Sequence, residues 1–193
     1  RSVLRLRSLH CDRMLCVGTK LTPLSSRSPF LPLHGRWCPP WLPANVSNAT
    51  HPYAWRPFML RIHNSRRFTL RNVSLVDSPF WTVVPTYSEG IVVAFVNITA
   101  STTSPNTDGV EPMWSRDVHI HDVAIVNGDD CITVKSGTSN VLAERITCRG
   151  SHGITVGSVW YDDVVNVTYR DVIRRTAIHY CAKNGAPAET VHA

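Results

Sequence analysis

Four side chains suited to proton transfer occur in three short motifs of this 193-residue chain. The motifs read Asn-Thr-Asp-Gly around Asp108, Gly-Asp-Asp-Cys around Asp129 and Asp130, and Gly-Ser-His-Gly around His152. Asp129 follows Asp108 by 21 residues, and His152 follows Asp130 by 22. Each motif alone is more typical of a turn than of a site. Their shared spacing is what indicates one site built from all three.

Carboxylates brought close together cannot all ionise freely, because like charges raise the pKa of at least one of them. A protonated acid then lies beside ionised bases, which is the arrangement that hydrolysis of a glycosidic bond needs. The acid protonates the leaving oxygen and a base activates water, while an imidazole can tune the acid or hold a sugar. These roles require a fold in which the chain returns to the same side of the molecule about every 21–22 residues, the spacing between the motifs.

From Phe68 onward, a repeat of strand-like segments supplies such a fold. Period-2 alternation and β-branched residues mark segments 68–76, 91–99, 118–126, 141–149 and 167–175. Their starts lie 23, 27, 23 and 26 residues apart, which is too short for a propeller blade. The chain is therefore predicted to be all-β, a right-handed parallel β-helix. Equivalent outward residues on successive coils lie about 4.8 Å apart, so the three motifs should meet on one outer wall.

The two ends of the chain differ from this repeat. Eight of the 13 prolines fall between Pro23 and Pro57, where they disfavour long helices and central strands. Residues 1–36 hold seven Lys or Arg and one acid, whereas residues 37–193 hold 13 of each sign. We expect an irregular, basic, proline-rich segment at 1–55, a β-helix catalytic domain at 56–180 and an irregular tail at 181–193.

The composition also bears on partners. The net charge of +6 comes from the N-terminal fifth, which favours a solvated segment over a nucleic-acid-binding surface. The longest apolar run, 91–96, is too short to cross a bilayer, so no membrane partner is expected. His119 and His121 alternate in a strand without a third ligand nearby, so no metal site is predicted. The chain is expected to be a monomer.

Six cysteines and five N-x-S/T sequons together favour a secreted, oxidised protein. An even number of cysteines permits disulfides without specifying their pairing. Glycosylation is predicted at the five sequon asparagines, which are Asn45, Asn48, Asn72, Asn97 and Asn166.

The order, spacing and flanks of the three motifs (GDDCITVKSG and CRGSHGITVGS) resemble polygalacturonases of glycoside hydrolase family 28. The resemblance runs from about residue 56 to about residue 172. It implies a pectin lyase-like β-helix, here incomplete at both ends, that is secreted to the cell wall. It further implies hydrolysis of α-1,4 bonds between galacturonic acid residues of pectin or polygalacturonate, with inversion and without a cofactor.

The resemblance assigns roles to the proton-transfer residues. It implies that Asp129 is the general acid and that Asp108 and Asp130 hold and activate the water. His152 resembles the histidine that supports the acid.

Other positions receive binding or structural roles. The resemblance implies that Asn106 would shape the substrate site. Independently of it, Lys135 is predicted to face the cleft and bind substrate, the alternative being that it faces solvent. Cys131 and Cys148 match a family disulfide beside the site.

The chain departs from the family pattern at one substrate-binding motif. The Arg-x-Lys expected one coil after Val167 is missing, and residues 177–181 read Ala-Ile-His-Tyr-Cys. His179, or alternatively Lys183, is the candidate that replaces those cations in binding the substrate carboxylate.

The cleavage pattern and the activity itself leave alternatives open. The sequence CRGSHG at residues 148–153 favours an exo-acting enzyme over an endo-acting one. A catalytically inactive β-helix that only binds pectin or a wall partner, and a hydrolase of another pectic polymer such as xylogalacturonan, remain alternatives.

Overall fold

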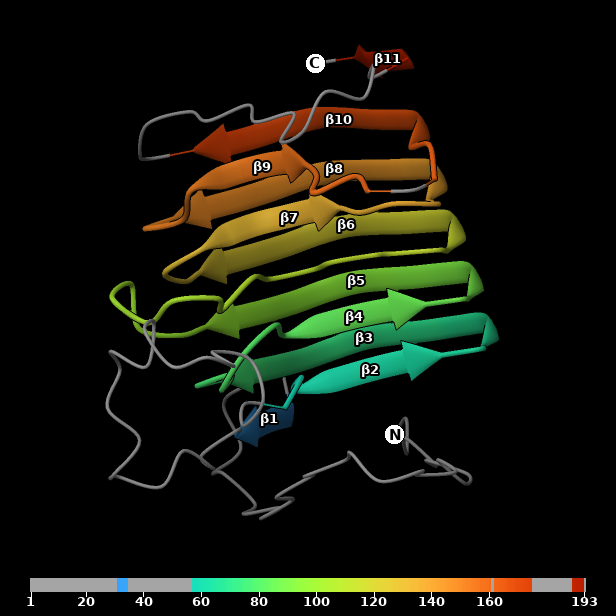
Figure 1. Cartoon of the computed structure of the whole chain (residues 1–193). Coiled ribbons are helices and arrows are strands. Elements are labelled where there is room, and N and C mark those ends of the chain that lie inside the picture. The colour runs from blue at the N-terminus through green and yellow to red at the C-terminus, as the bar shows by residue number, and fades with distance from the viewer. Residues whose placement is uncertain (1–30, 35–56, 161, 175–188, 193) are drawn as a thin grey trace, which may run out of the picture.

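The computed structural model describes residues 31–34, 57–160, 162–174 and 189–192. Every regular element among them is a strand, and the strands coil into the predicted right-handed parallel β-helix (Figure 1). The strands are β1 Leu31–His34, β2 Leu60–His63, β3 Arg66–Val76, β4 Val83–Thr86, β5 Glu89–Thr99, β6 Arg116–Val126, β7 Asp130–Val134, β8 Ser139–Arg149, β9 Gly153–Val156, β10 Val165–Arg174 and β11 Glu189–His192. Within the described ranges, no helix is long and apolar enough to span a membrane.

The long strands form one wall of the helix. They make a parallel seven-stranded sheet in the order β1-β3-β5-β6-β8-β10-β11. The five segments predicted from the repeat correspond to β3, β5, β6, β8 and β10, the last of them as far as Arg174, so the predicted strands are confirmed over the described residues.

The short strands form a second wall, stacked in front of the long strands in Figure 1. β2 pairs with β4 and β7 pairs with β9, both in parallel. Between these pairs, Val110 bridges to Val83 on one side and to Ile132 on the other. The second wall is therefore continuous from coil to coil, and the predicted site motifs lie along it.

Apolar side chains from both walls fill the space between them. In the long sheet, Ile98 pairs with Ile125 and Ile125 with Cys148, and all three are buried. Such stacking removes each side chain from water, and burying a Val or Ile side chain fully stabilises the folded state by about 1.5–3 kcal/mol. The identical register on successive coils is what fixes the axial position of the outward residues.

Each long strand from β3 to β10 turns two corners at residues with positive φ. In β6 these are Asp117 (φ 56°) and Asp122 (φ 53°), and the same two positions recur on the neighbouring coils. Asn and Asp adopt this left-handed conformation more readily than other non-glycine residues. The corners also bond to one another, because Asn140 donates to Asp117 (2.9 Å) and Asn166 donates to Asn140 (2.9 Å). Within the repeated segments, the second corner falls on a polar residue in four of the five strands, namely Asn72, Asp122, Arg145 and Asp171.

Strands β1 and β11 lie in the two segments that were expected to be irregular. β1 pairs with β3, and β11 pairs with β10, each in parallel. The expectation of wholly irregular ends is therefore wrong at these two strands. The physical reason is that the outer strand of a sheet presents unpaired N–H and C=O groups, which a short extended segment can satisfy without an alternating side-chain pattern.

Candidate active site

The three predicted motifs meet on the short-strand wall, where backbone bonds join their coils. The Gly109 N–H donates to the carbonyl of Asp130 (3.0 Å), and the His152 N–H donates to the carbonyl of Asp129 (2.9 Å). Asp108, the Asp129–Asp130 pair and His152 therefore lie on consecutive coils, side by side. This is the gathering that their spacing predicts.

Two glycines of the motifs allow the coils to approach closely. A Cβ on Gly109 would collide with the carbonyl oxygen of Cys131 and with the Ile125 side chain. A Cβ on Gly128 would collide with the carbonyl oxygen of Ser104. The glycines therefore set the distance between the coils that carry the acidic side chains.

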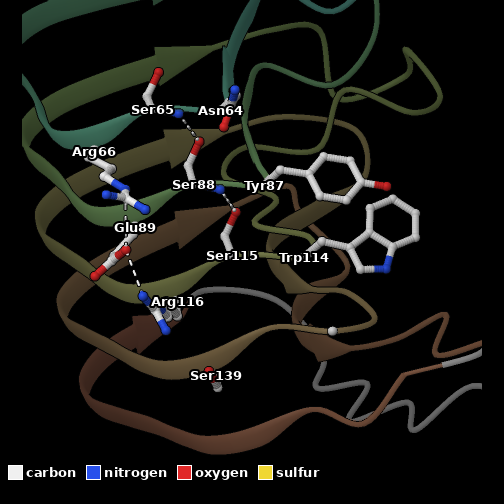
Figure 2. A pocket seen from close by; sticks show the side chains of 11 residues that line it. Asn64, Ser65, Arg66, Tyr87, Ser88, Glu89, Trp114, Ser115, Arg116 and Ser139 are labelled. Atoms are coloured by element: carbon white, nitrogen blue, oxygen red, sulfur yellow. Dashed lines mark hydrogen bonds and ion pairs between the residues drawn. The ribbon is translucent and has the colours of Figure 1, made fainter.

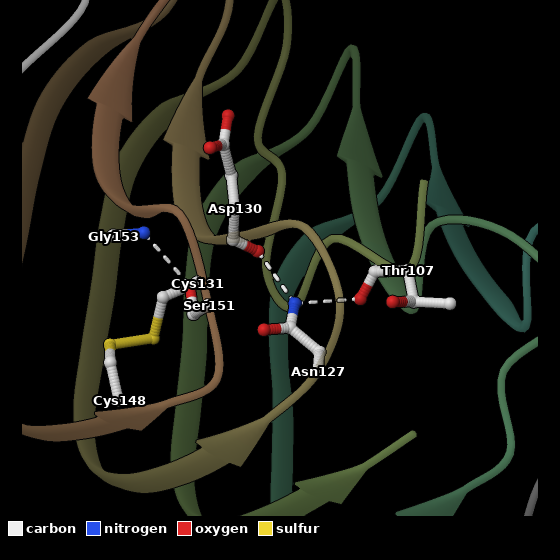
Figure 3. The surroundings of a disulfide bond; sticks show 7 residues. All are labelled: Thr107, Asn127, Asp130, Cys131, Cys148, Ser151 and Gly153. Atoms are coloured by element: carbon white, nitrogen blue, oxygen red, sulfur yellow. Dashed lines mark hydrogen bonds between the residues drawn. A yellow bond between two sulfur atoms is a disulfide. The ribbon is translucent and has the colours of Figure 1, made fainter. Parts of the chain in front are cut away.

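The Asn127 amide ties two of the motifs together from inside (Figure 3). Its Nδ2 donates to the carbonyls of Thr107 and Asp130, each at 2.8 Å. Asn127 is fully buried, so these bonds satisfy a donor that water cannot reach.

Asp129 and His152 form the solvent-facing part of the site. Asp129 Oδ1 accepts the Asp130 N–H (2.9 Å), and its Oδ2 accepts the Asn106 N–H (2.9 Å). His152 Nδ1 lies 3.3 Å from Asp129 Oδ1. The His152 side chain is 59% exposed and that of Asp129 is 19% exposed, so a ligand arriving from solvent meets these two groups.

Asp130 is buried and held by hydroxyl groups from two coils. Its Oδ2 accepts bonds from Thr133 Oγ1 (3.1 Å) and Thr155 Oγ1 (2.8 Å). Behind them, the Tyr169 hydroxyl donates to the carbonyl of Thr155 (3.2 Å). These contacts fix the orientation of the Asp130 carboxyl group.

Asp108 is a carboxyl group whose burial and acidic neighbours favour its protonated form. Burial, followed by the charges of Asp129 and Asp130, raises the pKa of Asp108 to about 8, although nearby Lys135 opposes the rise. The side chain is almost wholly buried, and its Oδ1 has no hydrogen-bond partner. One carboxyl pKa in the cluster is therefore raised, as predicted, but burial contributes more to the rise than the like charges on which the prediction rests.

A fifth group on this wall, Glu111, was missed by the sequence reasoning. Its side chain is fully buried, and Oε1 lies 2.8 Å from the Nζ of Lys135. Burial and the charge of Asp108 raise the pKa of Glu111 well above its usual range, and the contact with Lys135 offsets part of that rise. The only clue in the sequence is that Glu111 follows Asp108 by three residues on the same wall.

The disulfide predicted between Cys131 and Cys148 is present (Figure 3). Their Cα atoms are 6.0 Å apart, and both residues are fully buried. The bond joins β7, which carries Asp130, to the long strand β8 that follows it. The site wall and the opposite wall are thus covalently linked next to the acidic cluster.

The remaining predicted positions are spread over the chain. His179, Lys183, Asn45 and Asn48 lie outside the described residues. Among the other sequons, Asn72 and Asn166 are exposed, whereas Asn97 is half-buried.

One set of groups in the site has the proximity that a metal ion requires. Ligand atoms of Asp129, Asp130 and His152 lie within 4.8 Å of one another. Hydrogen bonds to backbone N–H and threonine hydroxyl groups already engage both carboxylates.

A separate hollow of about 350 Å³ lies where the short strands turn into the long ones (Figure 2). It contains none of the predicted site residues. Its polar groups bond along the coil axis, as when Ser88 N–H donates to Ser115 Oγ (3.1 Å) and Arg116 pairs with Glu89 (2.7 Å). Tyr87 and Trp114 stack beside them with ring centroids 5.1 Å apart. These contacts between equivalent residues of successive coils explain why polar and aromatic side chains line the hollow.

The fold and the site together define a class. A parallel β-helix with clustered carboxyl groups on its short-strand wall is the architecture of pectin lyase-like proteins. Residues 36–179 match the family described as glycosyl hydrolases family 28, and the chain belongs to this family.

Similar proteins come from plants, fungi and bacteria. The chain is 33% identical over 131 residues to a probable polygalacturonase of Vitis vinifera, covering 61% of this chain and 27% of the relative. It is 38% identical over 118 residues to rhamnogalacturonase A of Emericella nidulans, covering 60% and 23%. The solved polygalacturonase of Erwinia carotovora ssp. carotovora superposes with a TM-score of 0.58 at 34% identity, covering 61% and 32%. The chain spans about a quarter of the length of these curated relatives.

Proposed function

We propose that this chain hydrolyses α-1,4 bonds between galacturonic acid residues in pectin. The observation that carries the proposal is the meeting of Asp108, Asp129, Asp130 and His152 on three consecutive coils of one wall. Family membership and the relatives described as polygalacturonases support pectin as the substrate.

The geometry supports a division of labour among the carboxyl groups. Asp129, which is open to solvent and next to the exposed His152, donates its proton to the leaving oxygen. Asp130, whose Oδ2 is held by two threonine hydroxyls, takes the proton of the attacking water. Asp108, to which the resemblance gave the same role, stays protonated beside it, so it can hold the water but not take its proton. Its protonation also reduces the repulsion within the cluster. Attack by water opposite the leaving group inverts the anomeric centre.

We also propose that the chain removes residues from the end of its polymer. The sequence CRGSHG around His152 supports this exo-acting cleavage. The six cysteines and five sequons support a proposal that the protein acts outside the cell and is glycosylated.

The first test is chromatography of the products after incubating the full chain with polygalacturonate. The matched control is Asp129→Asn, which keeps the size of the side chain but not its acid. Release of monogalacturonate by the wild type alone is the expected result. Release of a series of oligomers instead would show that the cleavage is endo-acting and not exo-acting. No product from a folded sample would favour the alternative that the chain only binds pectin.

A second candidate substrate is the rhamnogalacturonan backbone. The observation that favours it is the 38% identity to rhamnogalacturonase A, the highest of the three similarities described above. The same incubation with rhamnogalacturonan in place of polygalacturonate separates the two candidates, since each enzyme releases different sugar ends.

A further inference from the structure

Glu111 lies on the site wall although the catalytic scheme above does not use it. Its backbone N–H donates to the carbonyl of Val83 (2.8 Å), and Val110 before it bridges Val83 and Ile132. The side chain is completely buried. A buried carboxyl group is rare without a partner, because leaving water is costly for a charge.

The partner is Lys135, which Glu111 holds in one place. The Lys135 ammonium lies 2.8 Å from Glu111 Oε1 and 5.2 Å from the centroid of the Trp81 ring. Only 14% of the Lys135 side chain is exposed. A lysine ordinarily carries a flexible, solvated ammonium, so these two contacts remove freedom that a surface lysine keeps.

Lys135 also lies within the electrostatic field of the acidic cluster. Its charge lowers the pKa of Asp108 against the larger effect of burial. A buried ion pair is weak evidence for stability, because desolvation cancels much of the attraction. Stability alone therefore gives little reason for a lysine at this wall, whereas binding of an anion gives a direct one.

We propose that Glu111 is a positioning residue that holds the Lys135 ammonium against Trp81, where that ammonium binds the carboxylate of a uronate residue of the substrate. The inference rests on the proposed function and adds a specificity contact to it. An ammonium has three donors, so one can bond to Glu111 while the others bond to the ligand. Trp81 limits where the ammonium can move.

The test is a double-mutant cycle of Glu111→Gln and Lys135→Met in the full chain, with KM and kcat measured on polygalacturonate. Lys135→Met should raise KM about tenfold, because it removes a charge-assisted hydrogen bond to the substrate. Glu111→Gln should raise KM about fivefold, with kcat changed less than about twofold. In the Lys135→Met background, Glu111→Gln should have no further effect, since it acts through Lys135.

A methyl-esterified polymer supplies the matched substrate control, because it lacks the carboxylate that Lys135 would bind. On this polymer the variants and the wild type should not differ. Equal losses on both polymers, or additive losses in the double variant, would show that Glu111 only supports the fold and would overturn the positioning role. A lower KM in Glu111→Gln would also overturn it, because Glu111 would then compete with substrate. If Glu111→Gln does not fold, Glu111→Asp, which withdraws the charge by one methylene, takes its place.

The outcomes separate this inference from the proposed function. A wild type that cleaves polygalacturonate while Glu111→Gln keeps the wild-type KM would overturn the role of Glu111 and leave the hydrolase intact. If the wild type binds without cleaving, the same cycle is measured as dissociation constants by calorimetry, and the same pattern is expected. A wild type that neither cleaves nor binds polygalacturonate would overturn both proposals.

Discussion

Hydroxyl groups position Asp130, the proposed base of the site. Thr155 donates to Asp130 Oδ2 (2.8 Å) and so does Thr133 (3.1 Å), and the two threonine Oγ1 atoms lie 3.0 Å apart. The Asp130 carboxyl group is thus aimed by two coils at once. Small changes in these threonines should therefore act on catalysis before they act on the fold.

Replacing Thr155 by Val should lower kcat on polygalacturonate by roughly tenfold to a hundredfold. The reason is that a hydrogen bond to a charged group contributes about 1.5–3 kcal/mol, and each 1.4 kcal/mol is a factor of about ten. Thr138→Val is the control, because the Thr138 hydroxyl is also buried but donates to the carbonyl of Pro112. Equal kcat values in the two variants would contradict the role given to Thr155.

Asp108 should make the protein less stable as the pH rises. Its pKa is about 8 in the folded state and 3.8 ordinarily, so the folded state binds the extra proton between these values. Stability is then lost progressively from pH 4 to pH 8. Asp108→Asn should remove this loss and be more stable than the wild type at alkaline pH, on the order of 6 kcal/mol, because the proton affinity differs by about four factors of ten between the folded and unfolded states and each factor of ten is about 1.4 kcal/mol.

The measurement for Asp108 is the free energy of unfolding in urea at pH 4, 6 and 8. The control is Asp163→Asn, since Asp163 is exposed. A difference between Asp108→Asn and wild type that stays constant with pH would refute the raised pKa.

At the scale of the element, the spacing between coils is set by backbone contacts at the motifs. Gly109 lies against the carbonyl of Cys131, and the disulfide from Cys131 to Cys148 ties the same coil to the opposite wall. The acidic cluster is therefore placed by the stacking of strands rather than by a flexible loop.

Gly109→Ala should force the two coils apart. We expect a loss of at least about 2 kcal/mol of stability and a loss of most activity, because overpacking a tight contact shifts the backbone. Gly90→Ala is the comparison: Gly90 has φ +66° but room for a Cβ, so it should cost about 1 kcal/mol and leave activity unchanged. Chemical denaturation and product release measured on both variants check this. Retained activity in Gly109→Ala would show that the spacing is not critical.

At the scale of the whole molecule, two groups of acids respond to pH in opposite directions. On the long sheet, the hydrogen bond from Arg170 lowers the pKa of Glu144 to about 2, and that from Arg145 lowers the pKa of Asp122 to about 2. Their contribution to stability is present above their ordinary pKa values near 4 and is lost as the pH falls towards 2. Asp108 contributes the opposite trend above pH 4.

The two trends predict a maximum of stability in mildly acidic solution, at about pH 4–5. The midpoint of thermal unfolding, followed by circular dichroism across the pH range, should fall on both sides of that maximum. In Arg170→Met the acidic side should fall less steeply, because Glu144 loses its largest stabilising contact. A midpoint that rises steadily to pH 8 would contradict the account.

Some features of the fold and the site could be predicted from the sequence, and others could not. The alternation within the segments predicted the long strands, and the spacing of Asp108, Asp129 and His152 predicted their meeting, because both follow from a fixed coil length. The contact between Glu111 and Lys135 was not predictable, since it depends on which side chains face each other across coils 24 residues apart. The proton on Asp108 depends on burial, which no motif encodes.

The coils of the β-helix differ in length, but the register between their strands does not change. The starts of the repeated segments differ by 23 to 27 residues, yet the strands keep one register. The surplus residues fall in the turns between β5 and Val110 and between β9 and β10, on either side of the acidic wall. The chain length can therefore vary in these two segments while the stacking of the strands on both walls stays the same.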